Sequence, residues 1–274
     1  MKLAVFTLES LANARAVRRF IADHSGEIAF VGISNPYRKS AGGSIGQFLR
    51  HLSRSGWRFV PFLALNFSLP GVIAALRQFW PWTTVAETTP VARLCKDYGI
   101  PTAIIHDLNT SETRAILHKS NADLIVSFHF DQIFNAESLE TTRLGGVNVH
   151  PSLLPHHRGP VPTWYAMQEE PPRFGVTIHR LVEKIDAGDI LLQEQVALPR
   201  TISALGAAVA LHEHGRRLLE TVLADIDAQR DLAVHPELLP YCPFPTPAAL
   251  AAAARRGHAL VRLADLWTVL RTAF

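Results

Sequence analysis

The sequence predicts an α/β protein built on an open, mostly parallel sheet with helices on both faces. Two observations predict this fold class. Over the first two thirds of the 274 residues, short apolar runs alternate with amphipathic segments, the order that produces successive β-α-β units. Apolar residues make up 48% of the chain and charged residues 19%, which is typical of a globular protein rather than a disordered one. The expected architecture is Rossmann-like.

Each element follows from its local pattern. Short apolar runs bounded by turn residues predict strands at 3–8, 28–33, 103–106, 124–130, 146–150, 176–181 and 190–198. Apolar residues at helical spacing predict helices at 11–23, 46–54, 90–98, 112–119 and 203–226. The apolar segment 58–65 contains Pro61, and proline cannot donate to a sheet ladder, so we expect an edge strand or a loop there.

The composition changes in the last fifth of the chain. We expect one domain over 1–226 and a C-terminal extension over 227–274, which includes a Pro-rich bridge. Thr246 followed by Pro247 predicts the start of a helix, because a capping hydroxyl and a proline in the first turn both favour one. The elements expected in the extension are a helix over 248–254 and one further strand over 259–263.

Charge and cysteine usage exclude several classes of protein. Lys and Arg total 27 against 24 for Asp and Glu, and the arginines are scattered, so no nucleic-acid partner is expected. Cys95 and Cys242 cannot form a disulfide framework, and without a CxxC pair they do not predict a zinc site. The sequence shows no cleavable leader and no apolar run long enough to cross a membrane. We therefore expect a soluble cytoplasmic enzyme or binding protein.

Two polar clusters stand out at the ends of predicted strands. In the first, NVHPSLLPHHRG over 148–159, Asn148 and His150 are two apart and project to the same side of an extended strand. Open α/β sheets bind ligands at this carboxyl end of their strands. In the second, EKIDAGD over 183–189, a loop could bring Asp186 to the first cluster.

An amide, an imidazole and a carboxylate together suit acyl transfer to an amine without an enzyme nucleophile. The amide N–H groups can donate to a developing oxyanion. An imidazole can donate or accept a proton near neutral pH, and a carboxylate can orient it. The spacing alone leaves open that Asn148, His150 and Asp186 are turn and capping residues.

The two clusters together resemble one enzyme family. The segments NVHPSLLPHHRGPVPTWYAM and GVTIHRLVEKIDAGDIL, in which Asn148 and Asp186 are 38 residues apart, are similar to those of the formyltransferase family. That family includes glycinamide ribonucleotide, methionyl-tRNA and sugar-nucleotide N-formyltransferases. The resemblance extends weakly from about residue 80 to 226, and before that only the β-α-β outline matches. It implies the formyltransferase fold, with 1–226 as the catalytic domain.

The resemblance also implies a co-substrate and residue roles. The family takes its formyl group from 10-formyltetrahydrofolate. By position, Asn148 would bind the formyl oxygen, His150 would stabilise the oxyanion, and Asp186 would pair with His150 and help deprotonate the amine. The pterin pocket of relatives is built largely from backbone groups, and its positions fall here on Phe130, Gln132, Ile133, Phe134, Val182 and Ile185. No metal site is expected.

Departures from the family pattern bear on the acceptor. Only 48 residues follow residue 226, too few for the C-terminal β-barrel of the tRNA enzymes, so tRNA is not the expected acceptor. The segment 7–10 replaces the glycine-rich phosphate loop of the purine enzyme, and no regulatory domain precedes the first strand as in the hydrolases. We expect a small primary amine, with a nucleotide-linked amino sugar as the leading candidate. A siderophore or antibiotic precursor, a hydrolase reaction and a methionyl-tRNA acceptor remain alternatives.

Further residues are open to two readings. Arg38, Lys39, Arg50 and Arg54 in the stretch 35–56 either bind an acceptor's phosphate or form a solvated surface. His156 and His157 are either acceptor-side or surface residues, whereas Arg158 is expected to brace the loop. The apolar tail and the Trp-rich stretch 79–82 could be core or the interface of a homodimer.

Competing site chemistries have weaker support. The pattern GGSIG at 42–46 matches the nucleophile elbow of serine hydrolases, but a polar loop separates it from the preceding strand. Ser152, two residues after His150, is better read as a loop-bracing hydroxyl than as a nucleophile. A zinc site at His150, His156 and His157 lacks a helical ligand pair. A folate- or nucleotide-binding module without activity is a last alternative.

Overall fold

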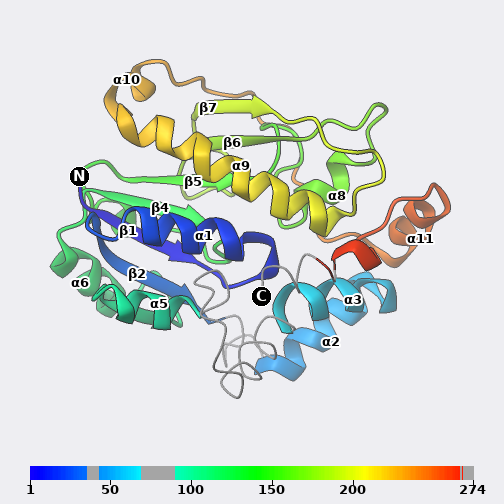
Figure 1. Cartoon of the computed structure of the whole chain (residues 1–274), viewed down its shortest axis with the longest axis horizontal. Coiled ribbons are helices and arrows are strands. Elements are labelled where there is room, and N and C mark those ends of the chain that lie inside the picture. The colour runs from blue at the N-terminus through cyan, green and yellow to red at the C-terminus, as the bar shows by residue number, and fades with distance from the viewer. Residues whose placement is uncertain (36–42, 69–89, 266, 268–274) are drawn as a thin grey trace.

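The computed structural model describes residues 1–35, 43–68, 90–265 and 267. Its centre is a seven-stranded sheet in the order β3-β2-β1-β4-β5-β6-β7 (Figure 1). The strands are β1 (Leu3–Thr7), β2 (Ile28–Ser34), β3 (Thr102–Ile105), β4 (Leu124–Phe128), β5 (Gly146–His150), β6 (Gly175–Arg180) and β7 (Ile190–Gln195). The first five are parallel, and β6 and β7 continue the sheet antiparallel. The predicted open, mostly parallel sheet is confirmed.

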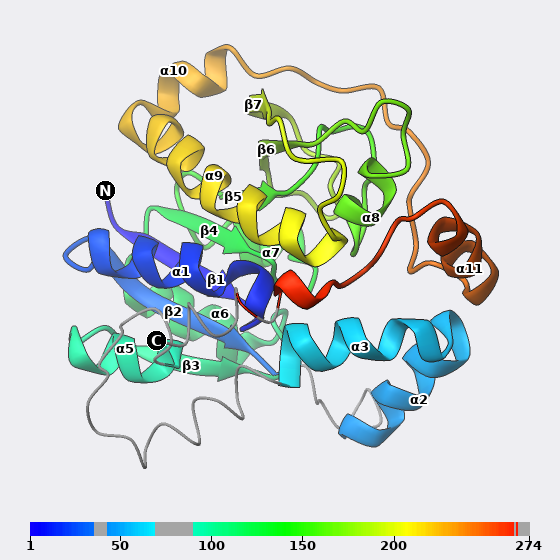
Figure 2. The same cartoon turned by 45° about the vertical axis from the view of Figure 1, so that its right-hand side comes forward.

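Helices cover both faces of the sheet. The helical segments are α1 (Leu11–Asp23), α2 (Gly43–Ser55), η2 (Trp57–Phe59), α3 (Val60–Leu63), η3 (Ala64–Ser68), α5 (Val91–Asp97), α6 (Ser111–Ser120), α7 (Ala136–Leu139), α8 (Pro162–Ala166), α9 (Ala204–Ala224), α10 (Ile226–Asp231) and α11 (Pro247–Arg255). Figures 1 and 2 both show α1 and α9 side by side over one face. In β1, Leu3 and Val5 join the core under these helices, and Ala4 and Phe6 join the core on the opposite face.

Helix α9 approaches the sheet closely at one glycine. A Cβ placed on Gly215 would lie 2.5 Å from a methyl of Val149 and 2.9 Å from one of Val176. These valines belong to β5 and β6, so glycine is what lets the helix lie directly against the strands that carry the polar clusters.

Two sequence predictions about local structure are wrong. The segment 58–65 is helical rather than an edge strand or loop, because Pro61 lies in the first turn of α3, where its missing N–H is not needed. The stretch 259–263 contains no strand. Its carbonyl oxygens at Ala259 and Leu260 instead accept from the first backbone N–H groups of α9, each at 3.0 Å.

The capping prediction for α11 is confirmed, since the hydroxyl of Thr246 accepts from the backbone N–H of Ala249 at 3.2 Å. Among the described residues, no helix is both long and apolar enough to cross a membrane. The expectations for Arg38, Lys39 and the stretch 79–82 lie outside the described residues.

A segment of the C-terminal extension crosses the body of the protein. We call residues 239–244 the strap. The backbone N–H of Cys242 donates to the carbonyl of Arg158 at 2.7 Å, and the hydroxyl of Tyr165 donates to the carbonyl of Pro243 at 2.5 Å. Gly159, at φ +131°, allows this approach, because a Cβ there would lie 2.2 Å from the carbonyl oxygen of Cys242.

Candidate active site

The described residues enclose a cavity of about 710 Å³ at the carboxyl ends of β1, β4 and β5. The strand order reverses between β1 and β4, which is where open α/β sheets bind ligands. One part of the lining comes from the loops after β4 and β6, and the other from α2, α3, η3 and α9. The strap supplies the rings of Tyr241 and Phe244.

The three groups expected to carry the chemistry meet in this cavity. Asn148 and His150 lie on β5, two residues apart, and line the cavity together with Asp186. The Nδ1 atom of His150 is 3.4 Å from Oδ1 of Asp186. Among the described residues, the Nε2 atom of His150 is buried with no hydrogen-bond partner, so this nitrogen is available to a ligand.

The loop that carries Asp186 is held by a buried arginine. The guanidinium of Arg158 donates to the carbonyls of Ile185 and Asp186 at 2.5–3.1 Å and to the carbonyl of Leu239 in the strap at 3.0 Å. The backbone N–H of Gly159 donates to Oδ2 of Asp186 at 2.9 Å. These contacts confirm the bracing role expected for Arg158. They also fix Asp186 at φ +47°, a conformation uncommon outside glycine.

His179 lies against both Asn148 and Asp186. Its Nδ1 lies 2.9 Å from the carbonyl oxygen of Arg180, which can only accept, so Nδ1 carries the proton. Its Nε2 therefore accepts from the amide of Asn148 at 3.1 Å, and it lies 3.7 Å from Oδ1 of Asp186. Burial is the main cause that lowers the pKa of His179 to about 4, so the ring is neutral near pH 7 and orients the amide.

Two further histidines line the cavity in neutral form. Burial lowers the pKa of His129 to about 4 and that of His212 to about 3. Their ring centroids are 5.8 Å apart. These two rings therefore present polar atoms without charge to the cavity near pH 7.

All six residues expected at the pterin line the cavity: Phe130, Gln132, Ile133, Phe134, Val182 and Ile185. The side chain of Gln132 accepts from the backbone N–H of Leu108 and donates to the carbonyl of Ile105. The ring of Phe134 is buried, 5.2 Å from that of Phe6. These two side chains are used by the fold, which leaves the backbone and the half-exposed Ile133, Val182 and Ile185 to a ligand.

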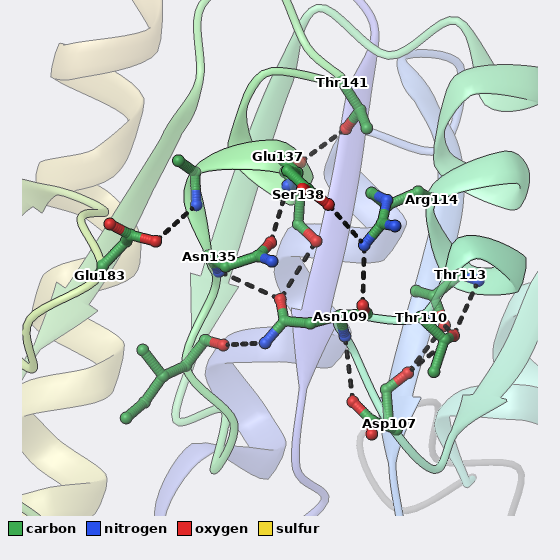
Figure 3. Close-up of polar contacts among 12 residues, drawn as sticks. Asp107, Asn109, Thr110, Thr113, Arg114, Asn135, Glu137, Ser138, Thr141 and Glu183 are labelled. Carbon is green, nitrogen blue, oxygen red and sulfur yellow. Dashed lines mark hydrogen bonds and ion pairs between the residues drawn. The ribbon is translucent and has the colours of Figure 1, made fainter.

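Asn109 fixes the backbone of this segment (Figure 3). Its Nδ2 donates to the carbonyl of Ile133 at 2.8 Å, and its Oδ1 accepts from the N–H of Asn135 at 3.0 Å and the hydroxyl of Ser138 at 3.1 Å. The carboxylate of Glu183 accepts from the N–H of Ala136 at 3.0 Å. The loops after β3, β4 and β6 are thereby joined behind the cavity wall.

The remaining candidates fall into place by their contacts. The hydroxyl of Ser152 donates to the carbonyl of His156 at 2.9 Å, which confirms the loop-bracing reading. His157 pairs with Glu169 at 3.0 Å. The described parts of the chain contain no group of three residues able to hold a metal. Gly42, in the serine-hydrolase pattern, lies outside the described residues.

Sequence reasoning missed His129, His179, His212 and Asn66 as lining residues. His179 was visible, because it ends the VTIH part of the motif and faces Asn148 across the β5–β6 ladder. His129 directly follows a buried strand. His212 and Asn66 carried no local signal, since their positions depend on how α9 and η3 pack.

A model of the formyl transferase family matches residues 80–223, more than half of the chain. The chain belongs to this formyl transferase family. The methionyl-tRNA formyltransferase of Anaplasma marginale is 34% identical over 145 residues, which are 53% of this chain and 48% of that protein. The methionyl-tRNA formyltransferase of Listeria innocua is 35% identical over 145 residues, 53% of this chain and 46% of that protein. The chain thus spans about half the length of the curated relatives it matches.

Solved structures of the formyl transferase family resemble the fold. A sugar N-formyltransferase from a Shewanella species matches with a TM-score of 0.52 at 18% identity, covering 99% of this chain and 88% of that one. The phosphoribosylglycinamide formyltransferase of Streptococcus pneumoniae matches with a TM-score of 0.54 at 18% identity, covering 81% and 97%. At these identities the likeness concerns the fold.

Proposed function

We propose that this protein is an N-formyltransferase that moves a formyl group from 10-formyltetrahydrofolate to a primary amine. The observation that carries the proposal is the convergence of Asn148, His150 and Asp186 in one cavity at the carboxyl edge of the sheet. Membership of the formyl transferase family supports the reaction class. A cavity of about 710 Å³ has the size of a site for a small-molecule ligand.

In the proposed reaction the amine nitrogen attacks the formyl carbon and forms a C–N bond. The formyl oxygen becomes an oxyanion, to which the amide of Asn148 and the Nε2–H of a doubly protonated His150 donate, while the Nδ1–H of that ring faces Asp186. Asp186 takes the proton that the amine loses, directly or through a water. The bond from the formyl carbon to N10 then breaks, and N10 receives a proton, which gives tetrahydrofolate and the formamide. His179, neutral and bonded to Asn148, keeps the amide oriented throughout.

The acceptor we propose is a nucleotide-linked amino sugar. Arg50 and Arg54 of α2 line the cavity. Guanidinium groups of this kind suit a phosphate. The rings of Tyr241 and Phe244 line the same cavity and offer surfaces for a flat base.

A methionyl-tRNA acceptor is the second candidate, favoured by the relatives that share about a third of their residues with this chain over 145 positions. Assays with each acceptor and 10-formyltetrahydrofolate separate the two. Release of formate at the same rate with and without an amine would instead point to a hydrolase.

The first test is a thermal-shift titration with 10-formyltetrahydrofolate or a stable analogue. A ligand at 100 times its Kd adds about 2.7 kcal/mol, which is a shift of roughly 5–11 °C for a chain of this size. Asn148→Ala, His150→Ala and Asp186→Ala should each reduce turnover by about 10²–10³. His214→Ala is the control, because His214 pairs with Glu194 and is not among the residues that line the cavity. No shift at saturation, or near-normal turnover in two of the three variants, contradicts the proposal.

A further inference from the structure

A buried asparagine in the cavity has half of its amide unused. The Oδ1 atom of Asn66, in η3, accepts from the backbone N–H of Ala12 at 2.9 Å and so caps the first turn of α1. This contact settles the orientation of the amide, because the N–H of Ala12 needs an acceptor. The Nδ2 atom is buried and has no hydrogen-bond partner among the described residues. Asn66 lines the cavity, so this donor is available to a ligand.

A buried histidine in the same cavity has an unused acceptor. The Nδ1 atom of His212 lies 2.8 Å from the carbonyl oxygen of Ala208. A carbonyl only accepts, so the proton is on Nδ1 and the Nε2 atom carries a lone pair. Nε2 is buried and has no partner among the described residues. Because burial keeps this ring neutral near pH 7, the lone pair is not titrated away.

The two unused atoms belong to side chains that line the same cavity, and His129 links the elements that carry them. The ring centroid of His129 is 5.8 Å from that of His212 and 6.3 Å from that of Phe67, the neighbour of Asn66. Asn66, Phe67, His129 and His212 all line the cavity. Buried polar atoms without partners are costly and rare in folded proteins, so an unused donor and an unused acceptor on residues that line one cavity point to a ligand group that pairs with both.

We propose that Asn66 and His212 form a subsite for an uncharged hydroxyl group of the amine acceptor. The hydroxyl donates a hydrogen bond to Nε2 of His212, and its oxygen accepts a hydrogen bond from Nδ2 of Asn66. A carboxylate can only accept, so it would be repelled by the lone pair of His212. An ammonium group can only donate, so it would be repelled by the N–H of Asn66. The subsite rests on the proposed function, because the hydroxyl belongs to the molecule that receives the formyl group.

The test uses two probe amines that differ by one hydroxyl, trans-2-aminocyclohexanol and cyclohexylamine. Ligand-observed NMR gives the Kd of each amine for the full chain, and mass spectrometry gives their formylation with 10-formyltetrahydrofolate. We expect the wild type to bind the hydroxylated amine at least about 10-fold more tightly, because the other amine leaves two buried groups unpaired. His212→Phe should bind the two amines equally, since it keeps the ring and removes the acceptor.

Two variants complete the design. Asn66→Asp keeps an oxygen for the N–H of Ala12 and removes the donor, so it should also lose the preference. His214→Phe, two residues from His212 but paired with Glu194, should keep it. Equal binding of the two amines by the wild type, which a structural water would give, overturns the subsite. No binding of the hydroxylated amine, or a preference that survives in His212→Phe, also overturns it. A preference without formylation of either amine retains the subsite and contradicts the proposed function.

Discussion

The imidazole of His179 accepts a hydrogen bond from the amide of Asn148 at 3.1 Å, across the antiparallel ladder of β5 and β6. The carbonyl of Arg180 holds the opposite nitrogen of the ring. The proton positions along this chain of contacts are therefore fixed by an atom that can only accept. One N–H of the Asn148 amide is donated to His179, which leaves the other for a ligand, and the orientation of the amide depends on a neutral ring.

Replacing His179 should reduce the chemical step more than binding. His179→Phe removes the acceptor that orients Asn148, and misplacement of a reacting group by about 1 Å can cost about 10²-fold in rate. We expect kcat to fall about 10–100-fold, with the KM for 10-formyltetrahydrofolate nearly unchanged. His179→Gln retains an acceptor and should recover part of the loss. Steady-state kinetics on His179→Phe and His179→Gln checks both expectations. A normal kcat in His179→Phe would exclude the positioning role.

Replacing Asn109 should instead weaken binding more than it reduces the rate of the chemical step. Asn109→Ala removes the three contacts that the Asn109 side chain makes with the segment after β4 (Figure 3). We expect the KM for 10-formyltetrahydrofolate to rise about 10-fold with kcat largely kept, because losing an interaction that is equal in the ground and transition states affects binding alone. Thr141→Ala is the matched control. The hydroxyl of Thr141 donates to the backbone carbonyl of Ser138 and does not take part in the contacts of Asn109. Equal KM values in the two variants would contradict the prediction.

The buried neutral histidines predict the pH dependence of stability. His129 and His179 have a pKa of about 4 and His212 of about 3 in the folded protein, against about 6.5 in the unfolded chain. Between about pH 6.5 and 4 the unfolded chain therefore binds more protons, so the free energy of unfolding falls as the pH falls. His24 acts in the opposite sense: burial lowers its pKa, but its hydrogen bonds to the carboxylates of Glu27 and Glu220 outweigh this and raise the pKa overall.

Urea unfolding at pH 7.0 and pH 5.0 measures this effect. We expect lower stability at pH 5.0, with each proton taken up contributing about 1.4 kcal/mol per pH unit. His212→Phe removes one of the three groups. The difference in the free energy of unfolding between pH 7.0 and pH 5.0 should therefore shrink by the contribution of one titrating histidine. Stability that is equal or greater at pH 5.0 would show that these rings are not held neutral.

The contact of α9 with the sheet predicts a strong effect of one added methyl group. In Gly215→Ala the new Cβ meets Val149 at 2.5 Å and Val176 at 2.9 Å, and neither stiff side chain can move aside. We expect a loss of about 1–3 kcal/mol, or about 2–12 °C in Tm. Gly26→Ala, where no atom lies within 4 Å of the new Cβ, is the control. Equal Tm values in the two variants would mean that α9 lies farther from the sheet.

Local pattern was enough to predict much of the fold and the central groups. The strand 146–150 was expected with the bounds that β5 has, because a short apolar run between a glycine and Pro151 leaves little choice. The two-residue spacing of Asn148 and His150 then placed both side chains toward one cavity. The second motif lies between two predicted strands, and this position predicted a loop that could bring Asp186 to the first cluster.

What the sequence did not predict depends on contacts between distant segments. The helical state of 58–65 depends on burial of Phe59 and Phe62, whose rings stack at 5.2 Å, and this packing outweighs a pattern that is ambiguous locally. Asn66 was missed because its partner, Ala12, lies 54 positions earlier. His212 reads as an ordinary helical residue until the packing of α9 against the sheet is known.

The strap has a consequence for the order in which the protein is made. During translation, Asn148, His150 and Asp186 are synthesised before the strap, residues 239–244. A nascent chain that has reached α10 therefore holds all three groups, but it lacks the rings of Tyr241 and Phe244 and the carbonyl of Leu239 that Arg158 engages. Among the described residues the strap is the last part of the cavity wall to be synthesised, so a chain that ends before residue 239 carries the motif without these contacts.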